Sequence, residues 1–314
     1  MQAPLPPDED VRLHTLHALN VLDTAPEADF DDIVALASGL CAAPISLVSL
    51  VDADRQWFKA RIGMEVTQTH REVSFCAHAI LGGDLMIISD ALTDARFADH
   101  PFVQATPGVR FYAGAPLRTG RGSALGTLCV VDHEPHRLTL DQIRALRALA
   151  HQVAEHLELR RRVVAPDTVE PPDPHDVDLA YLLEARIRTL RPIGDARRII
   201  TTFAIAGEPL VLADPRPLAQ ALDYVLFTAL KAAPDGGRVA VRVTDRPSPS
   251  FEVSHAGGSI EPAWQADLCG HCPAAEPVPA ATAAVLREHG ASVETNSEPP
   301  GSPDVRFELR FPSH

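Results

Sequence analysis

The pattern of apolar and polar positions in the first half of the chain predicts a helix followed by strands. Residues 29–40 carry apolar side chains at Ile33, Leu36, Ala37 and Leu40, which is the spacing of one helical face. Runs of β-branched and aromatic residues follow, separated by Asp, Gly and Pro, as expected for a largely antiparallel sheet. The predicted strands are residues 45–52, 57–63, 85–91, 111–119 and 126–132.

A capping box at residues 139–142 predicts the start of a further helix. Apolar residues recur along it at intervals of three and four, at Ile143, Leu146, Ala150, Val153 and Leu157. This spacing is typical of a coiled-coil seam and predicts a homodimer, to which an opening helix around Leu13, Leu16 and Leu19 contributes. The alternative is that the same face packs on the sheet of its own chain, and so short a run leaves both open.

The second half alternates helices and strands, which predicts a mixed α/β layer with strands on one side and helices on the other. An amphipathic helix over 179–190 precedes the strand RIITTFAIA. Asp214-Pro215 is a favourable helix start, and the helix that follows has one apolar face. The remaining predicted elements are the strands RVAVRVTD and SFEVSH, a helix over 280–289, and the strands ASVETN and VRFELRF.

Residues 163–178 separate the two halves. They contain four prolines and five acidic residues without an apolar period, which is typical of an extended, semi-rigid connector. The length of 314 residues also favours two domains over one. The sequence therefore predicts an α+β protein with one domain over 1–162 and another over 179–314.

Composition and charge narrow the classes of function. The formal net charge of −14 argues against binding to nucleic acid or to an anionic membrane, because both depend on clustered Lys and Arg. The longest apolar stretch, residues 39–51, is too short to span a bilayer, and the acidic first ten residues do not resemble a signal peptide. Five scattered cysteines do not suggest a disulfide framework. We expect a cytoplasmic protein with reduced thiols.

Several segments of the first half agree in order and spacing with a known domain family. They are DADRQWFKAR at 52–61, REVSFCAHAI at 71–80, DARF at 94–97, RFYAGAPL at 110–117 and GTLCVVD at 126–132. Together they resemble the GAF domain found at the front of bacterial sensor histidine kinases and cyclic-dinucleotide enzymes, over roughly residues 8–160. The resemblance implies a six-stranded antiparallel sheet with helices behind it and a small-molecule pocket in front.

Side chains from several of these segments are candidates for the pocket. Trp57 and Lys59 alternate with Phe58 and so share a face of a strand. The full candidate set is Trp57, Lys59, Arg71, Phe75, Cys76, His78, Asp90, Phe111 and Tyr112. The alternative is that the large aromatic residues belong to the core and that Arg71 pairs with a structural carboxylate such as Asp90.

Cys76 and His78 invite comparison with metal sites and with covalently bound bilins. A metal site needs three or four ligands, and no neighbouring pair supplies the others. Bilin-binding GAF domains usually carry adjacent Cys and His, whereas Ala77 intervenes here. We therefore expect no metal and no cofactor, an unidentified small-molecule ligand, and a Cys76 that packs as a small apolar residue.

In the second half, residues 218–239 resemble the helix of the histidine-kinase ATPase domain that carries two asparagines, the second of which coordinates Mg²⁺. Tyr224 and Thr228 stand at these positions, and Lys231 fits the usual basic position. Residues 253–260 resemble the segment whose Asp accepts a hydrogen bond from the adenine amino group. His255 replaces that Asp, Gly257 matches the first glycine, and Ser259 replaces the second.

Two further features of the kinase family are missing from this sequence. The phosphate-binding Gly-x-Gly-Leu loop is replaced by residues 274–284, which contain no glycine. The helical hairpin that carries a phosphoacceptor histidine is replaced by the connector, where His175 follows a proline. We therefore interpret residues 179–314 as a degenerate ATPase domain and His175 as a solvated connector residue.

Cys269 and Cys272 form a Cys-x-x-Cys motif in the region of the kinase ATP-lid loop. Such a dithiol is reactive where it opens a helix that follows a strand, and the flanks here lack that arrangement. Incidental cysteines are the main interpretation, and a local redox pair or half of a metal site is the lesser one.

These observations lead to three hypotheses about function. The first is a signalling regulator in which a GAF module, sensing a small molecule or redox state, is coupled to an inactive kinase-like domain that binds a two-component partner. The second is a divergent or split sensor histidine kinase that still binds ATP. The third is a thiol redox sensor that acts through Cys269 and Cys272.

Overall fold

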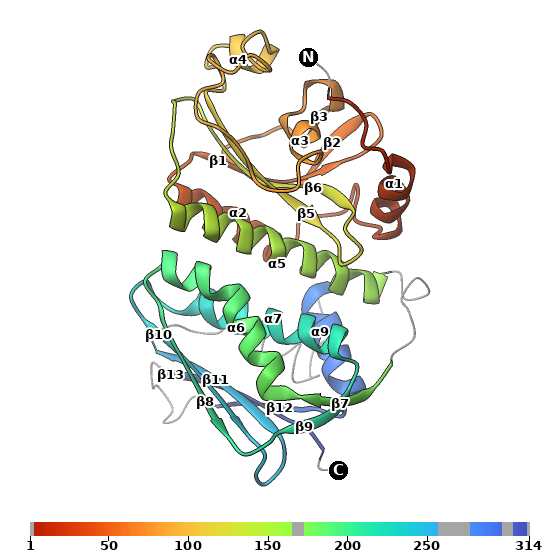
Figure 1. Ribbon diagram of the computed structural model, residues 1–314, viewed down its shortest axis with the longest axis vertical. Helices are drawn as coiled ribbons and strands as arrows, with labels where there is room; N and C mark the ends of the chain where they lie inside the picture. Colours follow the sequence, from red (N-terminus) through yellow and green to blue (C-terminus); the bar gives the residue numbers. More distant parts are fainter. Residues whose placement is uncertain (1–2, 165–172, 257–276, 297–303, 313–314) are drawn as a thin grey trace. The chain divides into compact units, whose positions relative to one another are not determined.

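A computed structural model gives the structure of this protein and describes residues 3–164, 173–256, 277–296 and 304–312. The chain forms two compact units, Met1–Glu158 and Leu159–His314. Each unit has its own sheet and its own helices, and each is described separately below (Figure 1).

The first unit contains a six-stranded sheet with the order β3-β2-β1-β6-β5-β4, in which every neighbouring pair is antiparallel. Its strands are β1 (Ile45–Val51), β2 (Arg55–Ile62), β3 (Gln68–His70), β4 (Met86–Ile88), β5 (Phe111–Arg118) and β6 (Ala124–Asp132). Five of the six were predicted from the sequence, and β3 was not. The number and direction of strands confirm the sheet that the resemblance implied.

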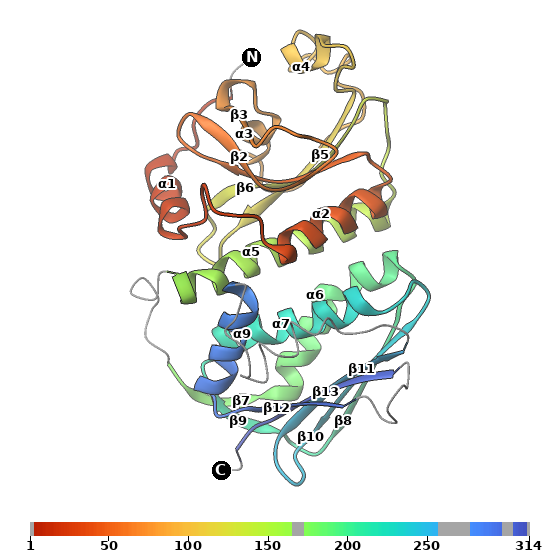
Figure 2. The same ribbon diagram turned by 180° about the vertical axis from the view of Figure 1, so that it is seen from behind.

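Helices lie on both faces of this sheet. They are α1 (Glu9–Ala18), α2 (Ala28–Cys41), α3 (Phe75–Ala79), α4 (Pro101–Gln104) and α5 (Leu140–Val164), with a short 3₁₀ helix at Arg71–Val73. Figures 1 and 2 show α2 and α5 along one face, and α3 over the opposite face. A buried cluster fills the space between α3 and the sheet, and we call it the α3 core. Its residues are Ile45, Leu47, Val51, Phe58, Phe75, Cys76, Ala77, Ala79, Ile80, Ile88, Ala91, Phe97, Val103, Tyr112, Ala124, Cys129 and Val131.

Local sequence signals set several of these boundaries. The predicted capping box is present, since the Gln142 amide donates to Thr139 Oγ1 at 3.2 Å and the Thr139 amide donates to Gln142 Oε1 at 2.8 Å. The Ser74 side chain accepts from the Ala77 amide and so caps α3. Gly126 allows β6 to approach β1, because a Cβ atom there would lie 1.9 Å from the Ser49 carbonyl oxygen.

Both ends of the predicted connector form regular elements. Helix α5 continues to Val164, and β7 (His175–Asp178) pairs with β9 (Leu210–Ala213). Residues 163–164 and 175–178 are therefore structured, because the helix of one unit and a strand of the other extend into the Pro-rich segment. His175 is exposed, as expected, and lies on β7.

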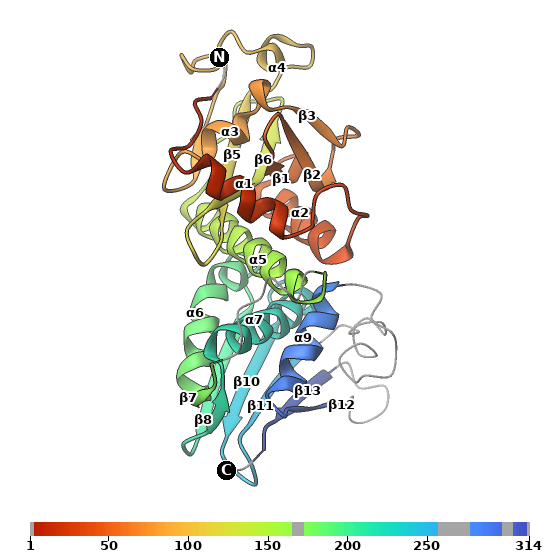
Figure 3. The ribbon, with the colours of Figure 1, turned by 90° about the vertical axis from the view of Figure 1, so that its right-hand side faces the viewer.

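The second unit contains a five-stranded sheet with the order β12-β13-β11-β10-β8, in which only β10 and β8 are parallel. Its strands are β8 (Ile200–Ala206), β10 (Arg238–Thr244), β11 (Ser250–Ala256), β12 (Ser292–Asn296) and β13 (Asp304–Arg310). The helices α6 (Leu179–Ala196), α7 (Pro215–Ala232) and α9 (Pro277–Glu288) lie on one side of this sheet (Figure 3). The predicted α/β layer and the α+β class are thereby confirmed.

Capping side chains open two helices of this unit. Asp178 accepts from the amides of Ala180 and Tyr181 at the start of α6, and Asp214 accepts from the Arg216 amide at the start of α7. Helix α6 continues through Pro192 and ends at Ala196, six residues beyond the predicted end at residue 190. The short strands β7 and β9 were not predicted.

Candidate functional site

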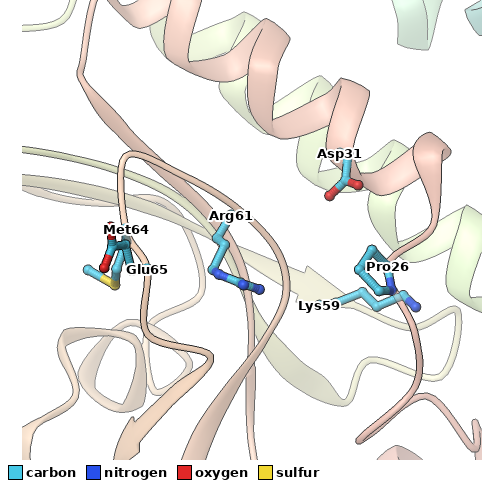
Figure 4. Close-up of a pocket in the computed structure, with 6 residues that line it drawn as sticks. All are labelled: Pro26, Asp31, Lys59, Arg61, Met64 and Glu65. Carbon is cyan, nitrogen blue, oxygen red and sulfur yellow. The ribbon is translucent and has the colours of Figure 1, made fainter.

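A hollow of about 480 Å³ opens between the start of α2 and strand β2 of the first unit (Figure 4). Figure 4 shows that its side chains come from the segment before α2, from α2 itself, from β2 and from the loop after β2. They are Pro26, Asp31, Lys59, Arg61, Met64 and Glu65. The lining therefore combines two carboxylates and two basic groups with a thioether. Of the nine predicted pocket residues, only Lys59 lines this hollow.

Lys59 occupies an extra position in β2. Ser49 of β1 pairs with Phe58 and Val48 pairs with Ala60, so Lys59 has no partner across the strands and forms a β-bulge. Its side chain is directed toward α2, where its ammonium lies 5.5 Å from the centre of the Phe30 ring.

Three oxygen atoms accept hydrogen bonds from the Lys59 ammonium. They are Thr24 Oγ1 at 2.9 Å, the Ala25 carbonyl at 2.7 Å and Glu27 Oε1 at 2.6 Å. The Lys59 side chain is 0% exposed and that of Glu27 is 9% exposed. Lys59 is thus an internal ion-pair partner that forms the inner wall of the hollow.

Asp31 and Arg61 contribute the charged rim of the hollow. Burial raises the pKa of Asp31, and the positive charges of Lys59 and Arg61 oppose that rise. Sequence reasoning missed Asp31, Arg61, Met64 and Glu65. For Arg61, Met64 and Glu65 the available signal was the run of charged and apolar residues at the end of β2 and after it, whereas Asp31 lies in the acidic first turn of α2.

The α3 core fills the space in which the resemblance placed a pocket. Phe75 stacks on Phe97 with ring centres 4.5 Å apart and on Tyr112 at 5.3 Å, and His100 lies 4.8 Å from Phe75. Burial lowers the pKa of His100 to about 4. Phe75 and Tyr112 therefore act as core residues, as the alternative interpretation proposed, while half-buried His78 packs edge-on against Phe97.

Two cysteine thiols meet within the α3 core. Cys76 Sγ of α3 lies 3.9 Å from Cys129 Sγ of β6, and the Tyr112 hydroxyl donates to Cys76 Sγ at 3.4 Å. Cys76 is 3% exposed and Cys129 is 0% exposed. Cys76 is thus buried, as expected, and its nearest polar partners include a second thiol, that of Cys129.

Arg71 and Asp90 do not pair, contrary to the alternative that the sequence suggested. Asp90 instead accepts two hydrogen bonds from Arg110, at 2.9 and 2.8 Å, and these lower its pKa. Arg71 forms an ion pair with Glu9 of α1 and donates to the Asp52 carbonyl at 2.9 Å. The reason is topological, because Arg71 follows the edge strand β3 while Asp90 lies at the far side of the sheet, after β4.

Glu9 is shared by two buried arginines. Arg12 donates to both of its carboxylate oxygens at 2.7 Å, and Arg71 donates to one of them. Burial alone would raise the pKa of Glu9, but the hydrogen bonds and charges of both arginines lower it to about 2. This group joins α1 to the sheet and does not line the hollow.

Trp57 and Phe111 do not face the α3 core. Trp57 precedes Phe58, which belongs to that core, so alternation places Trp57 on the opposite face of the sheet. Phe111 likewise precedes Tyr112 and packs 4.9 Å from the His136 ring. The members of the predicted set therefore lie on both faces of the sheet and do not line one hollow together.

In the second unit, Tyr224 and Thr228 lie one turn apart on α7 and share a face of that helix. They are 1% and 7% exposed. His255, on β11, is 4% exposed, and α7 packs against β11. Lys231 is half-buried near the end of α7. Gly257 and Ser259 lie outside the described residues, as do Cys269 and Cys272.

Asp223 is a polar residue of this region that sequence reasoning missed. It is 0% exposed on α7, and Arg186 of α6 donates to its carboxylate at 3.4 Å. An acidic residue inside an apolar helical run was the available signal. The ion pair connects two packed helices beside the position of Tyr224.

Comparison with known proteins assigns part of the chain to a family. Residues 25–157 match the sequence profile described as GAF domain. This region is a GAF domain. The cyclic di-GMP phosphodiesterase PA2567 of Pseudomonas aeruginosa is 47% identical to the chain over 132 residues, which cover 42% of this chain and only 22% of that protein.

Several solved structures similar to the chain are histidine kinases. The catalytic domain of histidine kinase ThkA is 15% identical, with a TM-score of 0.39, and the match covers 45% of this chain and 96% of that one. A mycobacterial sensor histidine kinase, MprB, is 20% identical with a TM-score of 0.37, covering 45% and 97%. Histidine kinase AdeS of Acinetobacter baumannii is 12% identical with a TM-score of 0.41, covering 56% and 85%.

The helix that ends the GAF domain contains the predicted dimer seam. Leu146, Ala150, Val153 and Leu157 are at most 2% exposed, and Ile143 is half-buried. Dimerisation through this helix stays a prediction.

Within the described residues, no three His, Cys, Asp or Glu side chains come together in a way that could hold a metal ion. None of the helices in the described part of the chain is long and apolar enough to cross a bilayer.

Proposed function

We propose that this chain is a cytoplasmic signalling regulator in which the GAF domain receives a signal and the second unit acts by binding another protein without using ATP. The observation that carries the proposal is the burial of Tyr224, Thr228 and His255 at positions where the kinase resemblance expects Mg²⁺ and adenine ligands. A two-component protein is the proposed partner, and a homodimer remains part of the proposal.

The chemistry of these three side chains supports loss of nucleotide binding. Mg²⁺ is held by oxygen ligands in strict octahedral geometry, and Thr228 offers a short hydroxyl in place of an amide. Tyr224 adds a large ring one turn earlier on the same helix face. His255 lacks the carboxylate that accepts the adenine amino hydrogens. Each lost polar contact costs about 1–3 kcal/mol, so three together would remove a micromolar affinity.

The relative from Pseudomonas aeruginosa supports the signalling part of the proposal. Its name describes an enzyme that acts on cyclic di-GMP, and the aligned 132 residues are about as long as the GAF match. Because these residues make up 22% of that protein, we infer that the two proteins share an input module. The net charge of −14 supports a protein or small-molecule partner over nucleic acid or membrane.

Calorimetric titration of the full chain with Mg-ATP tests the proposal, together with an autophosphorylation assay using radiolabelled ATP. We expect no binding at millimolar ATP and no label. The matched control is the triple variant Tyr224→Asn, Thr228→Asn and His255→Asp, which restores the family residues. A micromolar dissociation constant for the unmodified chain would favour the divergent-kinase hypothesis, and labelled histidine would establish it.

A further inference from the structure

The cysteine pair in the α3 core has a geometry that the proposed function does not use. Cys76 and Cys129 are 53 residues apart in sequence, on α3 and β6, and their sulfur atoms lie 3.9 Å apart. Cys41, also buried, lies on α2 outside the α3 core. The fold therefore selects two of these three buried thiols and places them in contact.

The surroundings of the pair favour one charged and one neutral sulfur. The hydrogen bond between the sulfurs lowers the pKa of Cys76 and, together with burial, raises the pKa of Cys129 well above its ordinary value. The Tyr112 hydroxyl also donates to Cys76. In Cys41, by contrast, burial alone raises the pKa to about 11. Cys76 is the one of the three whose neighbours stabilise a thiolate, the form that reacts with oxidants.

We propose that Cys76 and Cys129 form a disulfide when the protein meets hydrogen peroxide. The Cys76 sulfur attacks one peroxide oxygen, the O–O bond breaks, and a sulfenic acid and one water molecule result. The Cys129 sulfur then attacks the sulfenic sulfur, the S–O bond breaks, and a second water leaves. The two thiols lose two electrons and two protons, and hydrogen peroxide is reduced to two water molecules.

The disulfide would move the aromatic side chains of the α3 core. Its sulfur atoms must approach from 3.9 Å to about 2.05 Å, and the partner on β6 lies in the centre of the sheet. The adjustment therefore falls on α3, a helix of five residues. Phe75, the neighbour of Cys76, is stacked on Phe97 and Tyr112 and would shift with it. This deepens the sensory role proposed for the GAF domain and does not depend on the second unit.

The test uses the full chain with Cys269→Ser and Cys272→Ser, which leaves three cysteines. The protein is treated with hydrogen peroxide, then unfolded in the presence of iodoacetamide, and its mass and peptides are measured. A sample taken after peroxide and before iodoacetamide should have lost the mass of two hydrogen atoms. The peptides should include one cross-linked pair that contains Cys76 and Cys129. The matched variant Cys41→Ser should keep the cross-link, and Cys76→Ser or Cys129→Ser should abolish it.

Three results would overturn the proposal. They are alkylation of all three thiols after peroxide, a cross-link that includes Cys41, and sulfinic acid at Cys76 with Cys129 still alkylated. Peptide mapping of the protein with all three thiols decides the matter even if a serine variant fails to fold. The Mg-ATP titration of the same protein is a separate measurement, so failure of one proposal leaves the other distinguishable.

Discussion

Replacing Lys59 by Met should strongly destabilise the first unit. The substitution keeps the apolar stem but removes an ammonium that donates to three oxygens, one of them in the Glu27 carboxylate at 2.6 Å. Because the Lys59 side chain is 0% exposed and that of Glu27 is 9% exposed, water cannot easily replace the lost partner. Removing one partner of a buried ion pair costs about 3–5 kcal/mol. The double variant Lys59→Met and Glu27→Gln should cost less than the sum of the two single variants.

Urea unfolding measures this loss. The chain has two tryptophans, and replacing Trp264 by Phe leaves Trp57, two residues from Lys59, as the fluorescent reporter. With a slope of about 2 kcal/mol per molar urea, the midpoint should fall by about 2 M. Arg61→Met, on the same strand and the same hollow, is the matched control and should change the midpoint little. If the urea midpoint of Lys59→Met equals that of the control, the reasoning is refuted, and ligand binding becomes the better explanation for Lys59.

Three further predictions concern packing and pH. Gly126→Ala should destabilise the first unit by about 3 kcal/mol or more, because the added Cβ would lie 1.9 Å from a backbone oxygen. The control is Gly83→Ala, whose added Cβ would have no atom within 4 Å, and thermal melting compares the two variants. The pKa of Glu9 is lowered to about 2, so its ionised form stabilises the folded state fully at pH values above its pKa in the unfolded chain, near 4.3. The free energy of unfolding should therefore fall as the pH is lowered from about 5 to about 2, and should fall less in Glu9→Gln. The pKa of His100 is lowered to about 4, so the ring stays neutral in the folded protein. Its contribution to the free energy of unfolding should be complete above about pH 6.5 and be lost as the pH falls toward about 4, and NMR can follow the titration of the ring.

Local patterns predicted most helices and strands, because each depends on residues that are neighbours in sequence. The elements that were missed are short. Strand β3 has three residues, and β7 has the sequence HDVD, in which only Val177 is apolar. Such strands exist because a partner strand pairs with them, and the sequence gives no period from which to infer the partner.

The candidate site was harder to predict, for two physical reasons. Alternation shows which residues of a strand share a face, but it does not show what packs against that face, so Trp57 was grouped with Phe75 and Tyr112, which lie on the opposite face of the sheet. Ion pairs also form between distant segments. Arg71 binds Glu9 across 62 positions of sequence, and only the completed sheet brings α1 to the end of β3.

The extra position in β2 has a consequence for how this strand can vary in length. Without residue 59, Phe58 would still pair with Ser49 and Ala60 with Val48, and every other side chain would keep its face of the sheet. A one-residue deletion here is therefore compatible with the β1–β2 ladder, whereas a deletion elsewhere in β2 would invert the side chains beyond it. The extra residue thus places a positive charge against α2 and leaves the register of the β1–β2 pair unchanged on either side of it.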